Sequence, residues 1–271
     1  MTQILLWQTP PTHSCSEYLM KIATWNVNSL KVRLPHLLDW LAATQVDVIC
    51  LQELKCEDKS FPVAELEAAG YQAVFNGQKT YNGVAILSRS EITDVVRNIP
   101  GFEDEQRRII AATINEVRVV CGYFPNGQAV GSEKFEYKLR WLTALTDWLR
   151  DEMALHPKLV LAGDYNIAPE DRDVTAEWHD EIHVSVPERD AFRGLIGLGM
   201  TDAFRMFEQP EKLYSWWDYR MMAFRRNVGL RIDHLLVTEA LKDSVRSCII
   251  DKAPRKLERP SDHAPVVVEL G

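Results

Sequence analysis

Continuous apolar runs along the chain predict buried strands that end in polar residues. The clearest run is Leu159 to Ala162, which is followed by Gly163, Asp164 and Asn166. An apolar run that stops at a glycine and a polar loop is typical of a strand covered on both faces. Because side chains alternate along an extended backbone, Asp164 and Asn166 are expected to point the same way. The alternative is an ordinary turn after a strand.

The same periodicities predict the other elements and a single domain over residues 20–271. Strands are expected at 22–28, 46–51, 71–75, 83–88, 108–114, 117–123, 159–163, 230–238 and 266–270, and helices at 31–44, 62–69, 132–155 and 189–198. Strands that alternate with helices and hairpins indicate an α/β domain with mixed sheets. Residues 1–19 have no clear periodicity, so we expect them to form a loose extension.

Composition limits the function classes. The 271-residue chain has a net charge of −8, with 46% hydrophobic and 26% charged residues, so a sizeable core is expected without a global basic signature of nucleic-acid binding. A polyanionic ligand would therefore need metal ions or local Arg and Lys clusters. The sequence contains no apolar run of membrane-helix length, and its N-terminal apolar stretch has no basic residue before it, so we expect no secretory signal.

The cysteines indicate a reducing compartment. Their number is odd and their spacing is scattered: Cys15, Cys50, Cys56, Cys121 and Cys248. This pattern favours free thiols over a disulfide framework or a zinc site, and we expect a cytoplasmic protein without membrane attachment.

Polar residues of a few types recur just after the predicted strands. They are Asn26, Glu53, Tyr123, Asn126, Asp164, Asn166, Asp233, Asp262 and His263. Each has a structural alternative as a helix cap or a turn residue. Ligands gather at strand ends and loops, however, so several such endings on one chain predict a common pocket.

These residue types suit chemistry on a phosphate. Carboxylates together with asparagine favour Mg²⁺ or Mn²⁺ over zinc. Asp164 can orient or deprotonate a water molecule, and His263 can donate to a phosphate oxygen if Asp233 favours its charged form. Tyr123 and the neighbouring asparagines can stabilise charge that develops on phosphoryl oxygens.

Five motifs in order resemble the exonuclease III family of DNA-repair nucleases, across residues 20–271. They are Thr24-Trp25-Asn26-Val27-Asn28, Leu51-Gln52-Glu53-Leu54-Lys55, the stretch from Gly163 to Pro169, the stretch from Gly229 to His234, and the stretch from Pro260 to Pro265. The resemblance implies a four-layer sandwich, with two mixed β-sheets packed face to face and helices outside. It also implies a monomer that hydrolyses phosphodiesters of duplex DNA in base excision repair, at abasic sites or 3′ ends.

The resemblance assigns roles to individual residues. It implies a metal site of Asn26, Glu53, Asp164, Asn166, Asp262 and His263. It implies catalytic roles for Tyr123, Asp164, Asn166, Asp233 and His263, with Asn126 on the phosphate. Asp164 matches the residue that activates water, and Asp233 matches the partner of His263.

An aromatic and basic segment over residues 213–231 is a candidate DNA contact. Trp216 can pack on a sugar or base, and Arg220 and Arg231 can neutralise phosphates. The alternative is an aromatic core cluster with a solvated basic face. Lys79 marks a second candidate groove loop.

One position departs from the family pattern. His183 lies where the family often has a small residue. We hypothesise that its imidazole fills the slot for an abasic sugar, which would weaken cleavage at internal abasic sites and leave 3′ ends open to attack. The alternative is a surface histidine without effect.

Two other function classes remain open from the sequence. One is a phosphodiesterase or phosphatase of the same fold that acts on a substrate other than DNA. The cysteine pattern and the basic aromatic segment count against it. The other is an inactive DNA-binding module, which is disfavoured because every catalytic position is filled.

Overall fold

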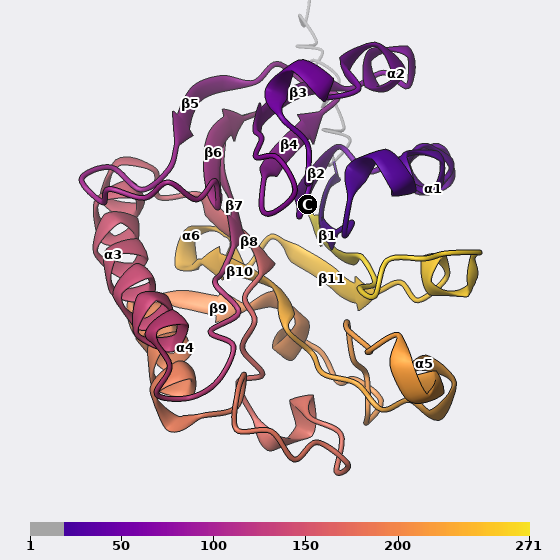
Figure 1. Cartoon of the computed structure of the whole chain (residues 1–271). Helices are drawn as coiled ribbons and strands as arrows, with labels where there is room; N and C mark the ends of the chain where they lie inside the picture. The colour runs from indigo at the N-terminus through magenta and orange to yellow at the C-terminus, as the bar shows by residue number, and fades with distance from the viewer. Residues whose placement is uncertain (1–18) are drawn as a thin grey trace, which may run out of the picture.

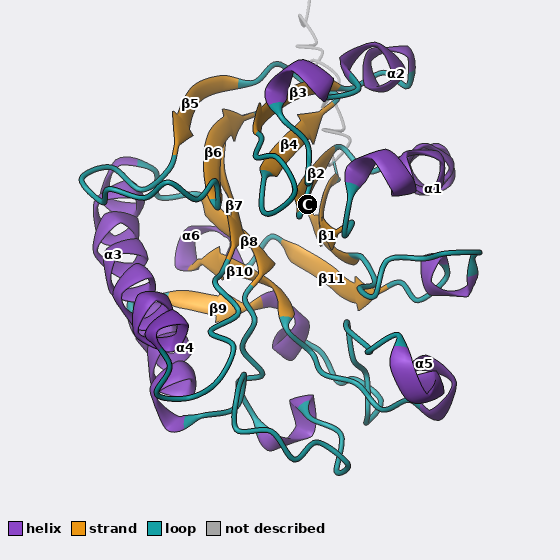
Figure 2. Ribbon diagram, in the orientation of Figure 1, coloured by secondary structure: helices purple, strands orange, loops and turns teal. Residues whose placement is uncertain are grey.

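The computed structural model describes residues 19–271, and the strands of this part form two mixed sheets of six (Figures 1 and 2). The first sheet has the order β11-β12-β1-β2-β4-β3, with β1 (Met20–Asn26), β2 (Val48–Gln52), β3 (Gln72–Asn76), β4 (Val84–Ser88), β11 (Val245–Ile250) and β12 (Val266–Leu270). The second has the order β5-β6-β7-β8-β10-β9, with β5 (Thr93–Arg97), β6 (Ile109–Ile114), β7 (Val117–Tyr123), β8 (Leu159–Asp164), β9 (Met200–Asp202) and β10 (Asp233–Thr238). One strand pair in each sheet is parallel, β1 with β2 and β7 with β8.

Helices cover the outer face of each sheet, which gives four layers. In Figure 1, α1 (Leu30–Thr44) and α2 (Val63–Ala68) lie on one side of the molecule, and α3 (Glu133–Leu155) and α4 (Val186–Gly197) lie on the other. The apolar faces of α1 and α2 pack on the first sheet, and those of α3 and α4 pack on the second. Two shorter helices are α5 (Ala223–Arg226) and α6 (Glu239–Lys242). This confirms the predicted four-layer sandwich.

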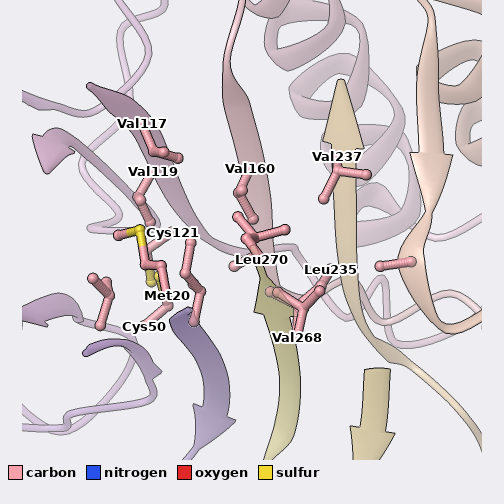
Figure 3. Packing of buried hydrophobic residues seen from close by; sticks show 14 of the residues in the cluster. Met20, Cys50, Val117, Val119, Cys121, Val160, Leu235, Val237, Val268 and Leu270 are labelled. Atoms are coloured by element: carbon pink, nitrogen blue, oxygen red, sulfur yellow. The ribbon is translucent and has the colours of Figure 1, made fainter. Parts of the chain in front are cut away.

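The main core lies between the two sheets (Figure 3). Strand β8 shows why its sequence is apolar without interruption. Val160 and Ala162 pack into the core between the sheets, whereas Leu159 and Leu161 pack beneath the outer helices. Burying each valine or leucine side chain contributes roughly 1.5–3 kcal/mol. Asp164 continues the alternation of Val160 and Ala162, so the strand aims its last carboxylate between the sheets.

Some predicted boundaries are wrong. Strands β5, β9 and β11 were not expected, because β5 and β11 alternate apolar and polar residues only weakly and β9 has three residues. Helix α4 begins at Val186 rather than residue 189, because Ser185 and Glu188 form a capping box there. The strands predicted at 108–114 and 117–123 pair as a hairpin, β6 with β7, and α3 begins next to residue 132 as predicted, where Ser132 caps it.

Other expectations fall partly outside the described part of the chain. The predicted extension over residues 1–19 lies outside the described residues, apart from its last residue. Four cysteines in the described part are free: Cys50, Cys56, Cys121 and Cys248. Within residues 19–271, none of the helices has the length and apolar character needed to cross a membrane.

Candidate active site

The ends of strands from both sheets meet at one edge of the sandwich. Asn26 ends β1 and Glu53 directly follows β2, which runs parallel to β1. In the other sheet Tyr123 ends β7 beside Asp164 at the end of β8, and the antiparallel strand β10 begins with Asp233 next to Asp164. Face-to-face packing of the sheets therefore brings these five polar side chains to one place.

Three of the predicted residues form a compact group that can hold a metal ion. One ligand atom each from Glu53, Asp164 and His263 lies within 4.8 Å of the others. The Asn26 amide joins the two acids, because its Nδ2 donates to Glu53 Oε1 and to Asp164 Oδ2 at 2.9 Å each. Two carboxylates beside an amide are the oxygen-rich surroundings that a hard divalent cation prefers.

His263 is better suited to contact a phosphate than to bind a metal. Its Nδ1 lies 2.8 Å from Asp233 Oδ2, and its Nε2 lies 3.7 Å from Asp164 Oδ2. Burial acts to lower the pKa of His263, but the charges of Asp233 and Asp164 outweigh burial and raise it to about 10. A charged imidazolium has no free lone pair for a metal, and it can donate Nε2–H to an anion.

Asp164 is the most perturbed acid of the site. Burial raises its pKa to about 7, against the opposing effects of the His263 charge and the Asn26 hydrogen bond. A carboxyl group that titrates near neutrality can accept a proton from water. Tyr123 is held beside it, because its hydroxyl donates to Glu53 Oε1 at 3.0 Å. Burial raises the pKa of Tyr123 well above its ordinary value, which keeps the phenol protonated as a donor.

Asn166 is placed by a turn rather than by strand alternation. It lies beyond β8 with φ of 50°, so the expected extended backbone is wrong, although its side-chain Nδ2 does donate to Asp164 Oδ2 at 3.3 Å. Its backbone N–H also donates to Asp164 Oδ1 at 2.9 Å, and its side chain donates to Phe124 O at 3.0 Å. The Asn126 amide donates to Asn166 Oδ1 at 3.3 Å, so the two predicted asparagines are neighbours.

His183 is buried at this site rather than exposed on the surface. Its Nδ1 lies 2.7 Å from the Asn166 carbonyl, and its Nε2 lies 3.5 Å from Asn126 Nδ2. Burial, reinforced by the Lys138 charge, lowers the pKa of His183 to about 3, so the ring is neutral. The alternative of a surface histidine is therefore wrong.

Asp262 lies beside the three-residue group but does not belong to it. Its Oδ1 accepts a hydrogen bond from Asn28 Nδ2 at 2.9 Å, and its Oδ2 accepts one from Trp216 Nε1 at 3.0 Å. Trp216 is half-buried and also packs edge-on against Trp178. A metal-binding role for Asp262 and a DNA-binding role for Trp216 stay predictions.

The predicted DNA contacts differ in exposure, and one is wrong. Lys79 and Arg220 are exposed, although Arg220 pairs with Asp218 at 2.8 Å. Arg231 has 1% of its side chain exposed, and its guanidinium pairs with Asp173 and Asp202. Two buried acids therefore neutralise Arg231, which places it out of reach of a phosphate.

Several site residues were given no role from the sequence. Lys55 Nζ lies 2.8 Å from Glu53 Oε2 and donates to Asn28 Oδ1 at 2.6 Å, within motifs that were already recognised. Lys138 and Glu188 form an ion pair in which neither side chain is exposed. A lysine on the apolar stripe of a predicted helix was a signal that could have found this pair.

A hollow of about 500 Å³ adjoins the group and offers space for a substrate. It is lined by Tyr123 and Asn126 on one side and by Tyr81, Arg108 and Tyr137 around it. A larger hollow of about 830 Å³ lies around Arg205 and contains none of the predicted site residues. The smaller hollow is therefore the one next to the chemistry.

Comparison with known proteins agrees with this geometry. Residues 23–263 match the profile of the Endonuclease/Exonuclease/phosphatase family. The chain belongs to this family. Exodeoxyribonuclease III of Haemophilus influenzae, a similar protein, is 36% identical over 267 residues, which cover 93% of this chain and all of the relative.

Two solved structures show the same fold as this family member. A 3′ phosphatase from Neisseria, bound to product DNA hairpin, is 50% identical to this chain, with a TM-score of 0.90. The alignment covers 93% of this chain and 99% of the phosphatase chain. An AP endonuclease from Archaeoglobus fulgidus is 37% identical with a TM-score of 0.89 over the same shares. Both the curated relative and these structures align along nearly their whole length.

The His263–Asp233 pair predicts a measurable pH dependence. In Asp233→Asn with chelator present, we expect the pKa of His263 to fall from about 10 toward its ordinary value of about 6.5. A raised folded pKa stabilises the fold fully below about pH 6.5, and this contribution is lost as pH rises through 10. The stability deficit of the variant should thus be largest near pH 6 and shrink toward pH 10. NMR titration measures the pKa of the His263 ring, and urea unfolding measures the free energy of unfolding at each pH. If the ring of the variant still titrates near pH 10, Asp233 is not the group that raises the pKa of His263.

Proposed function

We propose that this chain is a Mg²⁺-dependent DNA-repair nuclease that hydrolyses phosphate esters at 3′ ends of duplex DNA, both terminal 3′-phosphates and phosphodiesters, in preference to phosphodiesters at internal abasic sites. The observation that carries the proposal is the group of Glu53, Asp164 and His263 beside a hollow at the edge of the sandwich. The relatives described as exodeoxyribonuclease III and as a 3′ phosphatase support the reaction class.

The residues divide the work of hydrolysis between them. Glu53 and Asp164, joined by the Asn26 amide, would hold Mg²⁺ or Mn²⁺, which acts as a Lewis acid on the phosphate when bound. Asp164, held by hydrogen bonds from Asn26 and from the Asn166 backbone N–H, accepts the proton of the attacking water.

The remaining donors stabilise the negative charge that develops on the phosphoryl oxygens. His263 donates Nε2–H to the phosphate, while Asp233 holds its Nδ1 at 2.8 Å. Tyr123, Asn126 and Asn166 provide neutral donors beside the same hollow. Asp262 orients Asn28 and Trp216 at the rim of the site.

The preference for 3′ ends rests on His183. A buried imidazole against the Asn166 carbonyl fills space next to Asn126, which lines the hollow. At an internal abasic site, the abasic sugar lies on the 3′ side of the scissile phosphate and must enter this space, whereas a terminal 3′-phosphate has no sugar on that side. The Archaeoglobus relative is an AP endonuclease, so the family contains both preferences.

The assay of the wild-type protein separates the possible functions. The substrates are duplexes with a 3′-phosphate in a nick, with a recessed 3′ hydroxyl end and with an internal abasic site, each tested with Mg²⁺ and with chelator. We expect cleavage at 3′ ends that requires the metal, with weaker cleavage at the abasic site. Binding without cleavage of any substrate would instead indicate an inactive DNA-binding protein. We further expect the protein to be a monomer. We also expect it in the cytoplasm, because the four cysteines of the described residues are free thiols.

Replacing His183 should change the substrate preference. We expect His183→Ser to raise the ratio of abasic-site cleavage to 3′-phosphate removal by roughly tenfold, because the smaller side chain opens space beside Asn126. His179→Ser is the matched control, since this histidine is exposed nearby in the chain. For each variant, kcat/KM is measured on the abasic duplex and on the 3′-phosphate duplex, and the two values give the ratio. An unchanged ratio in His183→Ser would show that His183 does not set the substrate preference.

A further inference from the structure

Behind the two active-site asparagines lies a buried ion pair that the reaction has not yet used. Lys138 comes from the apolar stripe of α3, between the buried residues Phe135 and Leu142, and Glu188 comes from the first turn of α4. Their Nζ and Oε1 atoms are 2.5 Å apart, and both side chains have 0% exposure. Removing two charges from water is expensive, and replacing such a pair with apolar residues is often neutral or stabilising. Stability alone therefore does not explain it.

The hydrogen bonds of this pair hold backbone around the site, and Glu188 also caps α4 through Ser185. Besides Glu188, the ammonium of Lys138 donates to Asn166 O at 2.7 Å and to Asn126 O at 3.2 Å. Its three N–H groups are thus directed at three acceptors. The carboxylate of Glu188 accepts the His183 backbone N–H at 3.1 Å and the Ser185 hydroxyl at 2.6 Å. One buried pair therefore holds the segments at Asn126, Asn166 and His183, of which Asn126 lines the hollow.

The held segments have backbone conformations that need support. Asn166 and His183 have φ values of 50° and 72°, in the left-handed region that most side chains avoid. Such residues cost of order 1–3 kcal/mol each and persist only where the surroundings fix them. Lys138 fixes the carbonyl of one, and Glu188 fixes the amide of the other.

We propose that the buried Lys138–Glu188 pair is a positioning device for the reaction, which fixes the backbone of Asn126, Asn166 and His183 so that their side chains face the scissile phosphate. This inference rests on the proposed function. Lys138 acts through the asparagines, and it acts on the transition state rather than on DNA affinity. Misplacing a positioned group by about 1 Å can cost roughly 100-fold in rate.

The chain offers a matched control on the same helix. Arg118 and Glu152 form a second buried pair, with Nε and Oε2 2.7 Å apart, near the C-terminal end of α3. Arg118 lies at the start of β7, whereas the candidate active site lies at the end of that strand. Replacing both members of either pair avoids an uncompensated buried charge. The two double variants then differ in their place relative to the site and in the α4 cap that Glu188 forms.

The experiment compares Lys138→Met/Glu188→Leu with Arg118→Met/Glu152→Leu. On a nicked duplex with a 3′-phosphate, we expect the first double variant to lose roughly 10- to 100-fold in kcat, with KM changed less than about threefold. The control should keep kcat within about threefold. Hydrogen exchange, read by NMR on the folded proteins, should show faster exchange at the Asn166 and His183 amides in the first variant and unchanged exchange in the control.

Each outcome bears on a defined claim. Unchanged kcat and unchanged exchange at Asn166 and His183 in Lys138→Met/Glu188→Leu overturn the positioning role. Equal losses in both double variants also overturn it, since they indicate general loosening of α3. A wild-type protein that cleaves none of the DNA substrates refutes the proposed function instead, and the exchange data then still decide whether the pair holds these segments.

Discussion

Asp164→Asn should lower kcat on a 3′-phosphate duplex by roughly 10³-fold or more, the largest catalytic effect expected from one substitution in this chain. Asp164 accepts hydrogen bonds from Asn26 and Asn166 and lies 3.7 Å from His263 Nε2. Burial raises its pKa to about 7, which suits proton transfer near neutral pH. An amide of the same shape accepts no proton from water.

DNA affinity separates this effect from a loss of fold. Because the substitution removes a negative charge near the phosphate, we expect the Kd for duplex DNA to stay the same or improve, as measured by fluorescence anisotropy. Asp147→Asn, on the exposed face of α3, is the charge-matched control and should keep full activity. If Asp164→Asn keeps kcat within tenfold of wild type, the assignment of Asp164 as the group that activates water fails.

Arg231→Met should destabilise the protein by about 3–5 kcal/mol, the largest stability effect expected here. The Arg231 guanidinium pairs with Asp173 at 2.6 Å and with Asp202 at 2.8 Å, and 1% of the side chain is exposed. Removing the cation leaves Asp202 without the Arg231 charge and leaves Asp173 with Arg205 as its remaining cation. For a chain of this size, the expected fall in Tm is roughly 10 °C.

The salt dependence of DNA binding tests the corrected role of Arg231. A side chain that neutralises a phosphate contributes about one unit to the slope of log K against log salt. We expect Arg231→Met to leave this slope unchanged, at a temperature where the variant is folded. Arg220→Met is the matched control, because Arg220 is exposed, and it should reduce the slope with no change in Tm. The opposite result would restore Arg231 as a DNA contact.

The sequence predicted the parts of this protein where local pattern and tertiary environment agree. Strand β8 is apolar at every position because both of its faces are covered, so its end at Asp164 was evident. The hairpin at Asn115-Glu116 and the cap at Ser132 follow from local chemistry alone. The motifs that contain Glu53 and Asp164 lie close to the strand ends that sheet packing brings together.

The errors come from contacts between residues distant in sequence. The sequence around Arg231 predicts a surface cation, because it does not show that Asp173 and Asp202 lie beside the guanidinium. Lys138 and Glu188 are 50 residues apart, and their pairing depends on how α3 and α4 dock on the same sheet. Edge strand β9 has three residues, which is too short for a periodicity to be read. In each case tertiary packing, which a linear pattern does not contain, decides the environment.

Because the site is divided between the two sheets, catalytic activity shows whether the sheets have docked on each other. Glu53 follows a strand of one sheet, whereas Asp164 and Asp233 belong to the other, and the core of Figure 3 is what joins them. A folding intermediate in which only one sheet has formed would hold half of the acids and catalyse nothing. During refolding, the return of nuclease activity should therefore follow the final docking step and lag behind the recovery of secondary structure seen by circular dichroism.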